Sequence, residues 1–523
     1  MLKRFNLILI SALLFNISAA YAEDSFWADD SSPQGQIGLV WYEDVLRSGN
    51  GVSTVTAFGD DGEQYVCTSV TEAKCLTFKQ KQIDLMLPVC DGDKYQYCIQ
   101  GLQVGTVGQS LKPGKLERSI DGTTVPADEK DDLPFGGTTS LWTVAGAPNS
   151  AGNEMYSVGV HLRYSIVNGK VSLNNFQASV VPYRLEVGPN YRFMQTKVVN
   201  TFSGQQIVHD WHVGNCIWQE QALCAVATRW SSDALASLSL RVPNSVTGWL
   251  HGRLAEPMIN VEKINTKTNR ITVTAKPVTV PGSAPKVKVS EITPELKKVI
   301  TRNGAEPLRS DSGYVWQLEP AYYNLDWFNA WLPYTKDTAQ GFSDYWNFKS
   351  IAGNFSSNQE RNCLASTSKL IGLVTTNSLW YSGNPPQFKD SELNYKVASL
   401  HFNPDGVTPF LGTYDLIIDS NAARCLYGYS SAPIQASISV VSNNGDNQVA
   451  TSTLNENNGW LMLSAKGFTF SSPTIKVKIS QSGSASTSAN PSKRVISITC
   501  KKGKISTKVS GIQPKCPKGY SQN

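Results

Sequence analysis

The chain has 523 residues, of which 41% are hydrophobic and 17% charged, with 47 basic and 42 acidic side chains. This apolar content is sufficient for sizeable cores, and the length predicts roughly two to four domains. Low charge together with abundant serine, threonine, asparagine and glycine is typical of an extracellular β-protein and argues against an intracellular helical enzyme.

The N-terminus has the features of a secretory signal peptide covering residues 1–22. Lys3 and Arg4 form a basic start, an apolar run follows to Phe15, and Ala20 and Ala22 flank Tyr21 in a small-x-small cleavage site. No later stretch reaches about 18 consecutive apolar residues, so we expect no transmembrane segment after cleavage. The sequence therefore predicts a protein that is secreted or displayed at the cell surface.

The cysteines predict disulfides. Three pairs share the spacing C-x7-C, and the count is even after a signal peptide, whereas zinc sites favour C-x2-C spacing and nearby histidines, of which the chain has five. Pairing of neighbours is expected, and nested pairing of the first four, Cys67 with Cys98 and Cys75 with Cys90, remains an alternative. The expected disulfide residues are Cys67, Cys75, Cys90, Cys98, Cys216, Cys224, Cys363, Cys425, Cys500 and Cys516.

Strand patterns dominate the first half of the mature chain. Residues 23–120 are expected to form a Cys-rich β region and residues 137–275 a β domain. Alternating segments at 156–166 and 271–275 are predicted strands, and Asn168-Gly169 is a predicted hairpin turn. The Pro-rich residues 276–290 are interpreted as a linker.

Residues 291–480 are expected to hold an aromatic-rich segment and a C-terminal β-sandwich domain. A short helix is predicted after Thr293, with Pro294 in its first turn. Period-two alternation at 434–440 and 475–480 predicts strands with one solvated face. Residues 481–492 read as a flexible linker, and two strands around residues 501–503 predict a disulfide-closed hairpin tail at 493–523.

The predicted fold class is therefore mainly β, with several antiparallel β-sandwich-like domains stapled by disulfides, few short helices and a small C-terminal β-hairpin module.

The tail is strongly basic. Residues 493–523 carry eight basic side chains and no acidic one, while the rest of the mature chain is mildly acidic. Such a tail is suited to binding an anionic cell-envelope polymer or glycan by charge, and the alternative is a solvated tail that aids solubility. The candidate polymer-binding residues are Lys501, Lys502, Lys504, Lys508, Lys515 and Lys518.

Two segments carry a resemblance to a group of proteins. The tail Ile498-Thr-Cys500-Lys-Lys-Gly-Lys504, followed by Pro514-Lys-Cys516-Pro-Lys-Gly-Tyr520, resembles a basic Cys-x15-Cys ending of exported actinobacterial proteins without known activity. The block Asn421-Ala-Ala-Arg-Cys425-Leu-Tyr-Gly-Tyr429 is similar to the C-terminal region of such proteins. The resemblance implies a bacterial exported surface protein and carries over no catalytic residue.

Motifs for catalysis, metal and cofactors are missing or weak. His209 and His212 flank Asp210 and Trp211, but in a strand the two histidines point to opposite faces, so ordinary strand positions are expected. The chain has no G-x-S-x-G motif and no P-loop. All ten cysteines have expected disulfide partners, so we expect no thiol nucleophile. Acidic residues at 60–61 and at 91 and 93 are interpreted as turns. We expect no catalytic residue, no metal, no cofactor and no nucleic-acid partner.

The aromatic stretch 314–348 leaves two interpretations open. It contains Glu319, Asp326, Asp337 and Asp344 among tryptophans and tyrosines, and glycosidases use paired carboxylates beside aromatic platforms. A carbohydrate-binding or glycan-hydrolysing protein is thus the alternative function, and a buried core is the alternative structure. The leading expectation is an exported bacterial structural or interaction protein.

Overall fold

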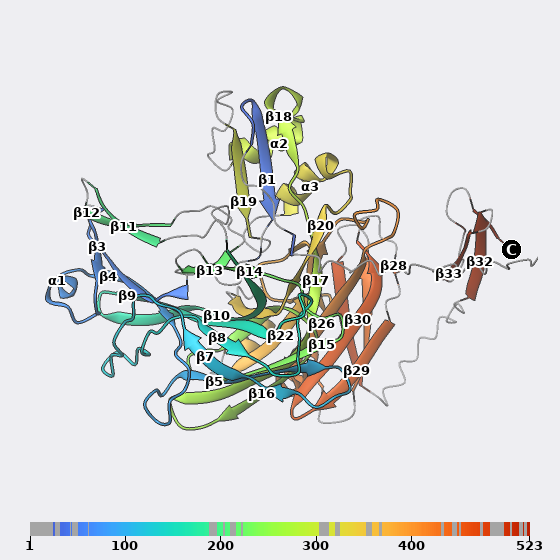
Figure 1. Cartoon of the computed structure of the whole chain (residues 1–523). Coiled ribbons are helices and arrows are strands. Elements are labelled where there is room, and N and C mark those ends of the chain that lie inside the picture. Colours follow the sequence, from blue (N-terminus) through green and yellow to red (C-terminus); the bar gives the residue numbers. More distant parts are fainter. Residues whose placement is uncertain are drawn as a thin grey trace, which may run out of the picture.

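The structure is a computed structural model. It describes residues 25–26, 32–41, 43, 51–60, 62–187, 196–201, 204–209, 216–220, 223–302, 313–319, 325–351, 358–365, 369–429, 434–441, 447–448, 451–470, 474–481, 496–502, 505–511, 516 and 520–522. Two sandwich-like units lie side by side, a small layer of strands and helices lies on top of them, and a separate C-terminal sheet follows (Figure 1).

The first sandwich is built by two sheets of mainly antiparallel strands. One sheet follows the order β12 (Gly204–His209), β3 (Gln64–Cys67), β2 (Thr54–Phe58), β4 (Gln80–Met86), β9 (Met155–Val167) and β10 (Lys170–Val187). The other follows the order β5 (Cys98–Thr106), β15 (Ala234–Pro243), β17 (Thr268–Gly282) and β16 (Gly248–Lys263). Shorter strands extend both sheets: β6 (Lys112–Pro113), β7 (Lys115–Ser119), β8 (Ser140–Thr143), β11 (Thr196–Thr201), β13 (Cys216–Glu220), β14 (Leu223–Ala227), β20 (Gly341–Tyr345) and β21 (Asn347–Ile351).

Apolar side chains from both sheets fill the space between them. Leu85 and Val160 come from one sheet and Leu238 and Val273 from the other, and all four are fully buried in one cluster. The ranges 23–120 and 137–275, expected as separate units, share this core, because β4 pairs with β9 and β5 pairs with β15. The predicted Asn168-Gly169 turn is confirmed, since Val167 pairs with Lys170 across it.

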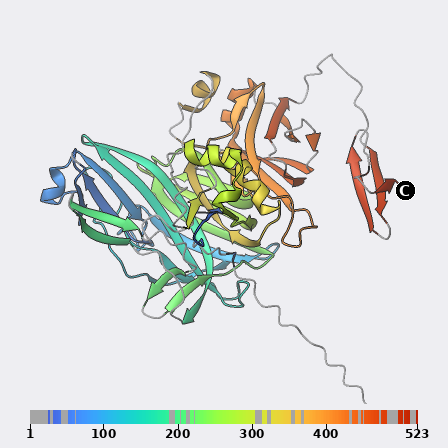
Figure 2. The same cartoon turned by 90° about the horizontal axis from the view of Figure 1, so that it is seen from above.

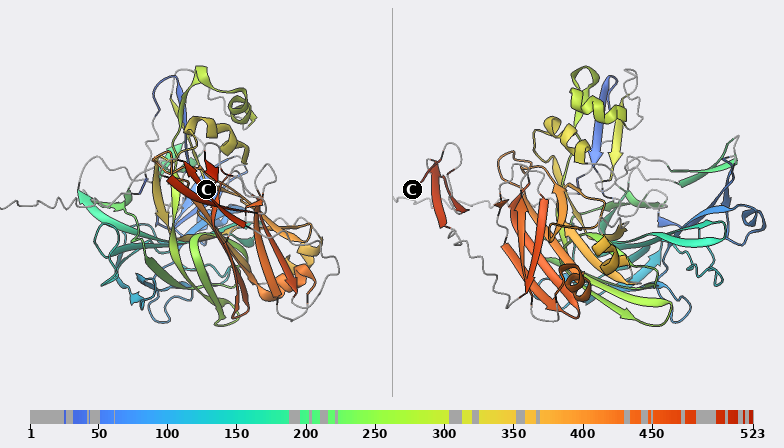
Figure 3. Two further views of the ribbon diagram at one scale, coloured as in Figure 1. Left: turned by 90° about the vertical axis from the view of Figure 1, so that its right-hand side faces the viewer. Right: turned by 180° about the vertical axis from the view of Figure 1, so that it is seen from behind.

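Strand β16 connects the second sandwich to the first, because its N-terminal half pairs in parallel with β22. One sheet contains β22 (Leu370–Thr376), β26 (Leu411–Asp419), β30 (Trp460–Thr469) and β29 (Thr451–Asn457). The facing sheet contains β23 (Trp380–Tyr381), β24 (Gln387–Lys389), β25 (Glu392–Ala398), β31 (Thr474–Gln481), β27 (Ile434–Val441) and β28 (Asn447–Gln448). Figure 3 shows these strands in orange and red beside the first sandwich.

The predicted alternation in this sandwich is confirmed. Ile475, Val477 and Ile479 of β31 are at most 2% exposed, whereas Lys478 between them is exposed. Residues from the facing sheets, such as Ile418 and Val440, meet in the same core.

The upper layer is a three-stranded sheet covered by two helices. Its order is β18 (Lys286–Lys288), β1 (Gln36–Trp41) and β19 (Tyr314–Leu318). The first strand that the structure describes is thus the middle strand of a sheet whose other members lie far later in the sequence. The helical elements are η2 (Val289–Glu291), α2 (Pro294–Arg302) and α3 (Leu325–Thr335). Figure 2, seen from above, shows α2 and α3 lying over the body.

Helix α2 confirms the helix predicted after Thr293. The Thr293 hydroxyl accepts a hydrogen bond from the backbone N–H of Leu296 at 3.2 Å, as an N-terminal cap does. Leu296, Val299 and Ile300 are at most 6% exposed and share the face that packs into the core of the upper layer. The cap and the apolar spacing thus act together to place this helix.

The segment 276–290, expected as a linker, is instead part of the sheets. β17 runs to Gly282, where it pairs with β20, and β18 begins at Lys286. Val278 and Val280 alternate with Thr279 and are at most 5% exposed, so their burial outweighs the loss of donors at the prolines. The alternation, rather than the proline content, determined the local structure.

Five disulfides join the ten cysteines in the neighbouring pairs that the spacing predicts, which rules out the nested alternative. The Cα–Cα separations are 5.0 to 6.1 Å, and no cysteine is free. The disulfide with the largest sequence separation, 62 residues, joins Cys363 in a π-helical turn to Cys425 in a helix. The short helical elements at these bridges are α1 (Ala73–Leu76), α4 (Asn358–Glu360), η3 (Arg361–Ala365) and α5 (Ser420–Tyr427).

The C-terminal tail forms a sheet of its own. β32 (Ile496–Lys502) and β33 (Ile505–Gly511) form an antiparallel hairpin, and β34 (Ser521–Gln522) pairs with the free edge of β32. The predicted hairpin is confirmed, and Cys500, bonded to Cys516, is fully buried although the sheet is small. The predicted linker 481–492 lies outside the described residues apart from Gln481, which ends β31. Within the described chain, no helix combines the length and hydropathy needed to cross a membrane.

Candidate functional site

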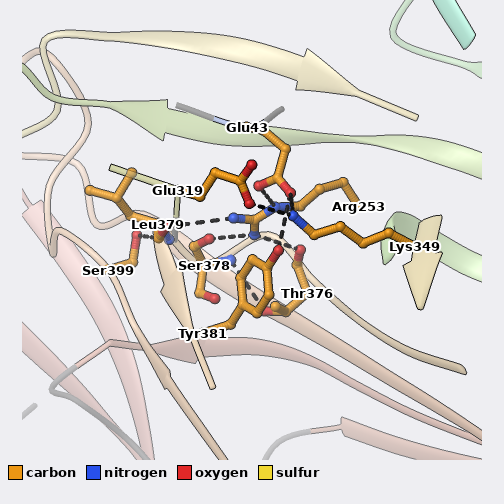
Figure 4. A network of polar contacts seen from close by, with 9 residues as sticks. All are labelled: Glu43, Arg253, Glu319, Lys349, Thr376, Ser378, Leu379, Tyr381 and Ser399. Atoms are coloured by element: carbon orange, nitrogen blue, oxygen red, sulfur yellow. Dashed lines mark hydrogen bonds and ion pairs between the residues drawn. The ribbon is translucent and has the colours of Figure 1, made fainter. Parts of the chain in front are cut away.

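The densest set of buried charges lies where the three cores meet. Figure 4 shows Glu43 beside Arg253 and Lys349, with Glu319 and Tyr381 around them. Glu43 follows β1, Arg253 lies in β16, Lys349 in β21, and Tyr381 in β23, so four separate strands position these groups. These residues, with Glu319 and His251, are called the Glu43 junction below.

Glu43 and Arg253 form the centre of the Glu43 junction. The Arg253 Nε donates to the Glu43 Oε2 at 2.8 Å, and the Tyr381 hydroxyl donates to the Glu43 Oε1 at 3.1 Å. The side chains of Glu43 and Arg253 are 2% and 0% exposed. Burial opposes ionisation of the Glu43 carboxyl, but Arg253 and Lys349 outweigh it and hold the pKa of that carboxyl below its usual value.

The remaining donors of Arg253 are used by backbone. Its Nη1 donates to the carbonyl oxygens of Thr376 at 3.1 Å and of Ser378 at 2.5 Å, just before β23. A planar guanidinium can hold a carboxylate and several carbonyls at once, which an ammonium cannot do with the same geometry. Arg253 therefore fixes the path of residues 376–379 between the two sheets of the second sandwich.

Lys349 balances the charge of the Glu43 junction. Its Nζ lies 3.0 Å from the Glu319 Oε2 and 3.7 Å from the Glu43 Oε1. Burial lowers the pKa of Lys349, but Tyr381, Glu43 and Glu319 outweigh burial and raise it well above its ordinary value. Two cations thus face two carboxylates, of which Glu43 is buried and Glu319 is 25% exposed, and this matching of charge is the arrangement in which buried charges are tolerated.

His251 completes the Glu43 junction. Its ring stacks on Tyr381 with centroids 3.5 Å apart and planes 8° apart, and it is fully buried. Neither ring nitrogen has a hydrogen-bond partner among the described residues. Burial and the charges of Arg253 and Lys349 hold the pKa of His251 well below its ordinary value, so the ring is neutral in the folded protein.

A second charged cluster lies between β4 and β9, around the buried carboxylate of Asp84 and at the side of the partly exposed Arg163. Asp84 accepts hydrogen bonds from the Nε of Arg163 at 2.6 Å and from the Gln82 amide at 2.8 Å, and its Oδ1 lies 2.9 Å from the His161 Nε2. Burial opposes ionisation, but His161 and Arg163 hold the pKa of the Asp84 carboxyl well below its usual range. These residues are cross-strand neighbours, so the cluster reinforces the pairing of β4 with β9.

A third pair joins His401 to Asp337 at the edge of the body. The His401 Nδ1 lies 2.5 Å from the Asp337 Oδ2, and the backbone N–H of His401 donates to the other carboxylate oxygen at 2.9 Å. The backbone N–H of Phe402 donates to the Asp337 carbonyl at 3.1 Å. The pair fastens two loops together through both backbone and side chain.

Three of the four carboxylates of the aromatic stretch each contact a different basic side chain. Glu319 pairs with Lys349, Asp337 with His401, and Asp344 accepts from Arg229 through both oxygens at 3.0 and 3.1 Å. Asp326 lies exposed in the first turn of α3, where the helix dipole favours a negative charge. No two of these four residues share an ion-pair partner among the contacts described here.

The tryptophans of the same stretch are core residues. Trp316, Trp327, Trp331 and Trp346 are at most 7% exposed. Trp327 and Trp331, four apart in α3, both pack against Trp316, with ring centroids 5.8 and 6.2 Å from it. A sugar-binding platform needs an open ring face, and none of these four tryptophans provides one.

The other sequence-based candidates lie as follows. The backbone N–H of Lys94 donates to the Asp91 carbonyl at 3.0 Å and that of Gly62 donates to the Gly59 carbonyl at 3.1 Å. Asp60 and Asp93 therefore lie in turns, as predicted, while Asp61 is outside the described residues. His209 ends β12, while residues 210–215 lie outside the described part. In the tail, Lys501 is exposed in β32, Lys502 and Lys508 lie in β32 and β33, and Lys504, Lys515 and Lys518 are outside the described residues. No cluster of three or more metal-ligating side chains occurs among the residues that the structure describes.

Sequence reasoning missed the Glu43 junction. Arg253 and Lys349 each interrupt an apolar strand, at Leu250-His-Gly-Arg253-Leu and at Phe348-Lys349, and charged residues in such runs are seldom buried unless paired. That signal identifies two buried cations, but the partner Glu43 lies 210 residues before Arg253 and no local pattern connects them.

The chain was compared with protein-family models, with curated proteins and with solved structures, and none of the three comparisons gives a match.

Proposed function

We propose that this chain is an exported structural or interaction protein of the cell surface, held by its basic tail to an anionic polymer of the envelope. The observation that carries the proposal is the tail itself: a small disulfide-closed sheet, paired only within itself among the described strands, in a segment with eight basic residues and no acidic one. A unit of this size cannot build a sizeable hydrophobic core and depends on its disulfide for stability. We therefore assign it a role separate from the stability of the body.

The body supports a structural role. Its buried charges are matched pairwise at the Glu43 junction and at Asp84, where they connect strands and cores. Five disulfides are compatible with an oxidising compartment outside the cytoplasm. The polar clusters therefore serve stability, and the surface of the sandwiches is what the protein would present.

The test uses the full chain and two charge series. In the first, the six tail lysines are changed to glutamine, for example Lys501→Gln, and in the matched control they are changed to arginine. Binding is measured to surfaces coated with a phosphate-rich polymer, with a carboxylate-rich polymer or with a neutral glycan, at about 0.01 M and about 1 M salt, where the Debye length falls from about 30 Å to about 3 Å.

The proposal expects binding of the wild-type and arginine proteins to an anionic surface at low salt, and loss of binding for the glutamine protein or at high salt. Comparison of the two anionic polymers identifies the chemistry that is recognised. Equal binding of the glutamine and arginine proteins would remove the tail from this role, and binding only to the neutral glycan would assign the activity to the body.

A further inference from the structure

The first described residues of the chain are held by residues far later in the sequence. The backbone N–H of Phe26 donates to the Phe342 carbonyl at 2.7 Å, and the Ser343 hydroxyl donates to the Phe26 carbonyl at 3.1 Å. Further along, β1 pairs with β18 and β19, and Glu43 pairs with Arg253. The described residues of this segment, Phe26, 32–41 and Glu43, are called the strap below.

The middle of the strap, β1, lies between β18 and β19 and pairs with both. β1 is antiparallel to β18, with Ile37 opposite Val287, and parallel to β19, with Leu39 opposite Trp316. Ile37 and Leu39 are fully buried. Strand insertion of this kind combines backbone hydrogen bonds, which supply affinity, with pockets for alternate side chains, which supply specificity.

The start of the strap has an aromatic anchor. Gly282 and Gly341 face each other across β17 and β20, and the Phe26 ring lies against both. A Cβ at Gly282 would lie 2.0 Å from the Phe26 Cδ1, and one at Gly341 would lie 2.7 Å from the Phe26 Cδ2. The two glycines therefore leave the space that the ring fills.

The end of the strap has a charged anchor. Glu43 brings a carboxylate to Arg253 and Lys349, which without it would form a buried pair of cations facing Glu319 alone. Its partner Tyr381 lies 338 residues away in the sequence. Aromatic, apolar and charged contacts thus come from Phe26, β1 and Glu43 in turn.

We infer that the strap fills a peptide slot built by residues 253–381, and that the same slot accepts the strap of a second copy of this chain. Every pairing, hydrogen bond and ring contact given above for the strap goes to that range and none to β2–β5, the next described strands of the same chain. None of the ten cysteines precedes Cys67, so no disulfide holds the strap.

The connection to the body makes the chain's own strap the favoured occupant. Residues 44–50 join Glu43 to Gly51, and a short tether gives an effective concentration in the range of about 1 mM. Exchange therefore needs release of the strap or a high protein concentration. Since each copy has one strap and one slot, reciprocal exchange closes a dimer and successive exchange makes a chain of subunits.

The first experiment tests the slot in the full-length protein. A protease recognition sequence is placed within residues 44–50, the folded protein is cleaved, and the strap is expected to remain bound until mild denaturant releases it. A labelled peptide of residues 26–43 should then bind the remaining body in equal amount. A Leu39→Asp peptide should bind at least about 100-fold more weakly than the parent peptide, because the introduced charge would be buried. A Gln34→Asp peptide changes an exposed position and should bind as tightly as the parent.

The second experiment tests the exchange between copies. Two full-length proteins with different tags are mixed at high concentration, partly unfolded and refolded, and mixed pairs are isolated through both tags. Excess strap peptide should prevent the pairs and the Leu39→Asp peptide should not. Dissociation of the strap on cleavage, equal binding of the two variant peptides, or pairs that the strap peptide leaves intact would overturn the inference.

Discussion

Glu43→Gln would remove one charge from the centre of the Glu43 junction and leave the shape of the side chain nearly unchanged. The Arg253 Nε would keep an oxygen acceptor, but two buried cations would then face the single carboxylate of Glu319. The perturbation therefore tests whether balance of charge, rather than the number of hydrogen bonds, stabilises the place where the three cores meet.

The magnitude follows from burial. The side chains of Glu43 and Arg253 are 2% and 0% exposed, so water screens them little. Loss of one partner from a buried, hydrogen-bonded ion pair costs about 3–5 kcal/mol of stability. The same substitution at an exposed pair costs about 1 kcal/mol or less.

Strand β16 supplies the matched control. Glu262 pairs with the Arg270 Nη1 at 2.7 Å, but their side chains are 55% and 37% exposed. Free energies of local opening are measured by hydrogen exchange on peptides from β1, β16 and β23 in both variants. Glu43→Gln should lower protection in all three strands by the larger amount, and Glu262→Gln should change it little. Equal small effects of the two variants would refute the reasoning.

Three further predictions concern other groups. Because the pKa of His251 in the folded protein lies well below its ordinary value of 6.5, the unfolded chain binds a proton there before the folded protein does as the pH falls. This contribution to the free energy of unfolding should be complete above about pH 6.5 and should decrease by up to about 1.4 kcal/mol per pH unit below it. Denaturant unfolding should show a shallower decrease in His251→Phe. Replacing Cys363 and Cys425 by alanine should cost about 4 kcal/mol, against about 2.5 kcal/mol for Cys216 and Cys224, because the closed loops span 62 and 8 residues; unequal thermal shifts would show this, and equal ones would contradict it. Trp331→Ala should cost about 3–5 kcal/mol in denaturant unfolding and leave affinity for any glycan unchanged, whereas loss of binding without loss of stability would restore the platform interpretation.

Local patterns in the sequence predicted much of the fold. The helix after Thr293, the Asn168-Gly169 hairpin and the alternation at Ile475 and Val477 all depend on residues within a few positions of one another. Four of the five disulfides follow from spacing for a similar reason, since their cysteines lie 8 or 16 positions apart, whereas Cys363 and Cys425 are the two cysteines that remain. Features of this kind are determined by residues close together in the sequence, so a local pattern is sufficient to predict them.

Long-range placement could not be predicted in this way. No pattern in Gln36–Trp41 indicates that it lies between β18 and β19, and nothing near Glu43 indicates Arg253. The predicted linker at 276–290 is wrong, because burial of the alternating Val278 and Val280 keeps this segment in the sheet in spite of its prolines. The tail lysines were predicted from charge alone, and their role as polymer-binding residues stays a prediction.

The order of the disulfides along the chain has a consequence for biosynthesis. Counted from the N-terminus, the first cysteine bonds to the second, the third to the fourth, and so on to the tenth. An oxidase that joins cysteines in the order in which they emerge from a ribosome or a translocon forms the native set directly. We therefore expect that the native set forms without a disulfide isomerase, and that the yield of oxidised protein follows the supply of oxidant rather than the reshuffling of mispaired bonds.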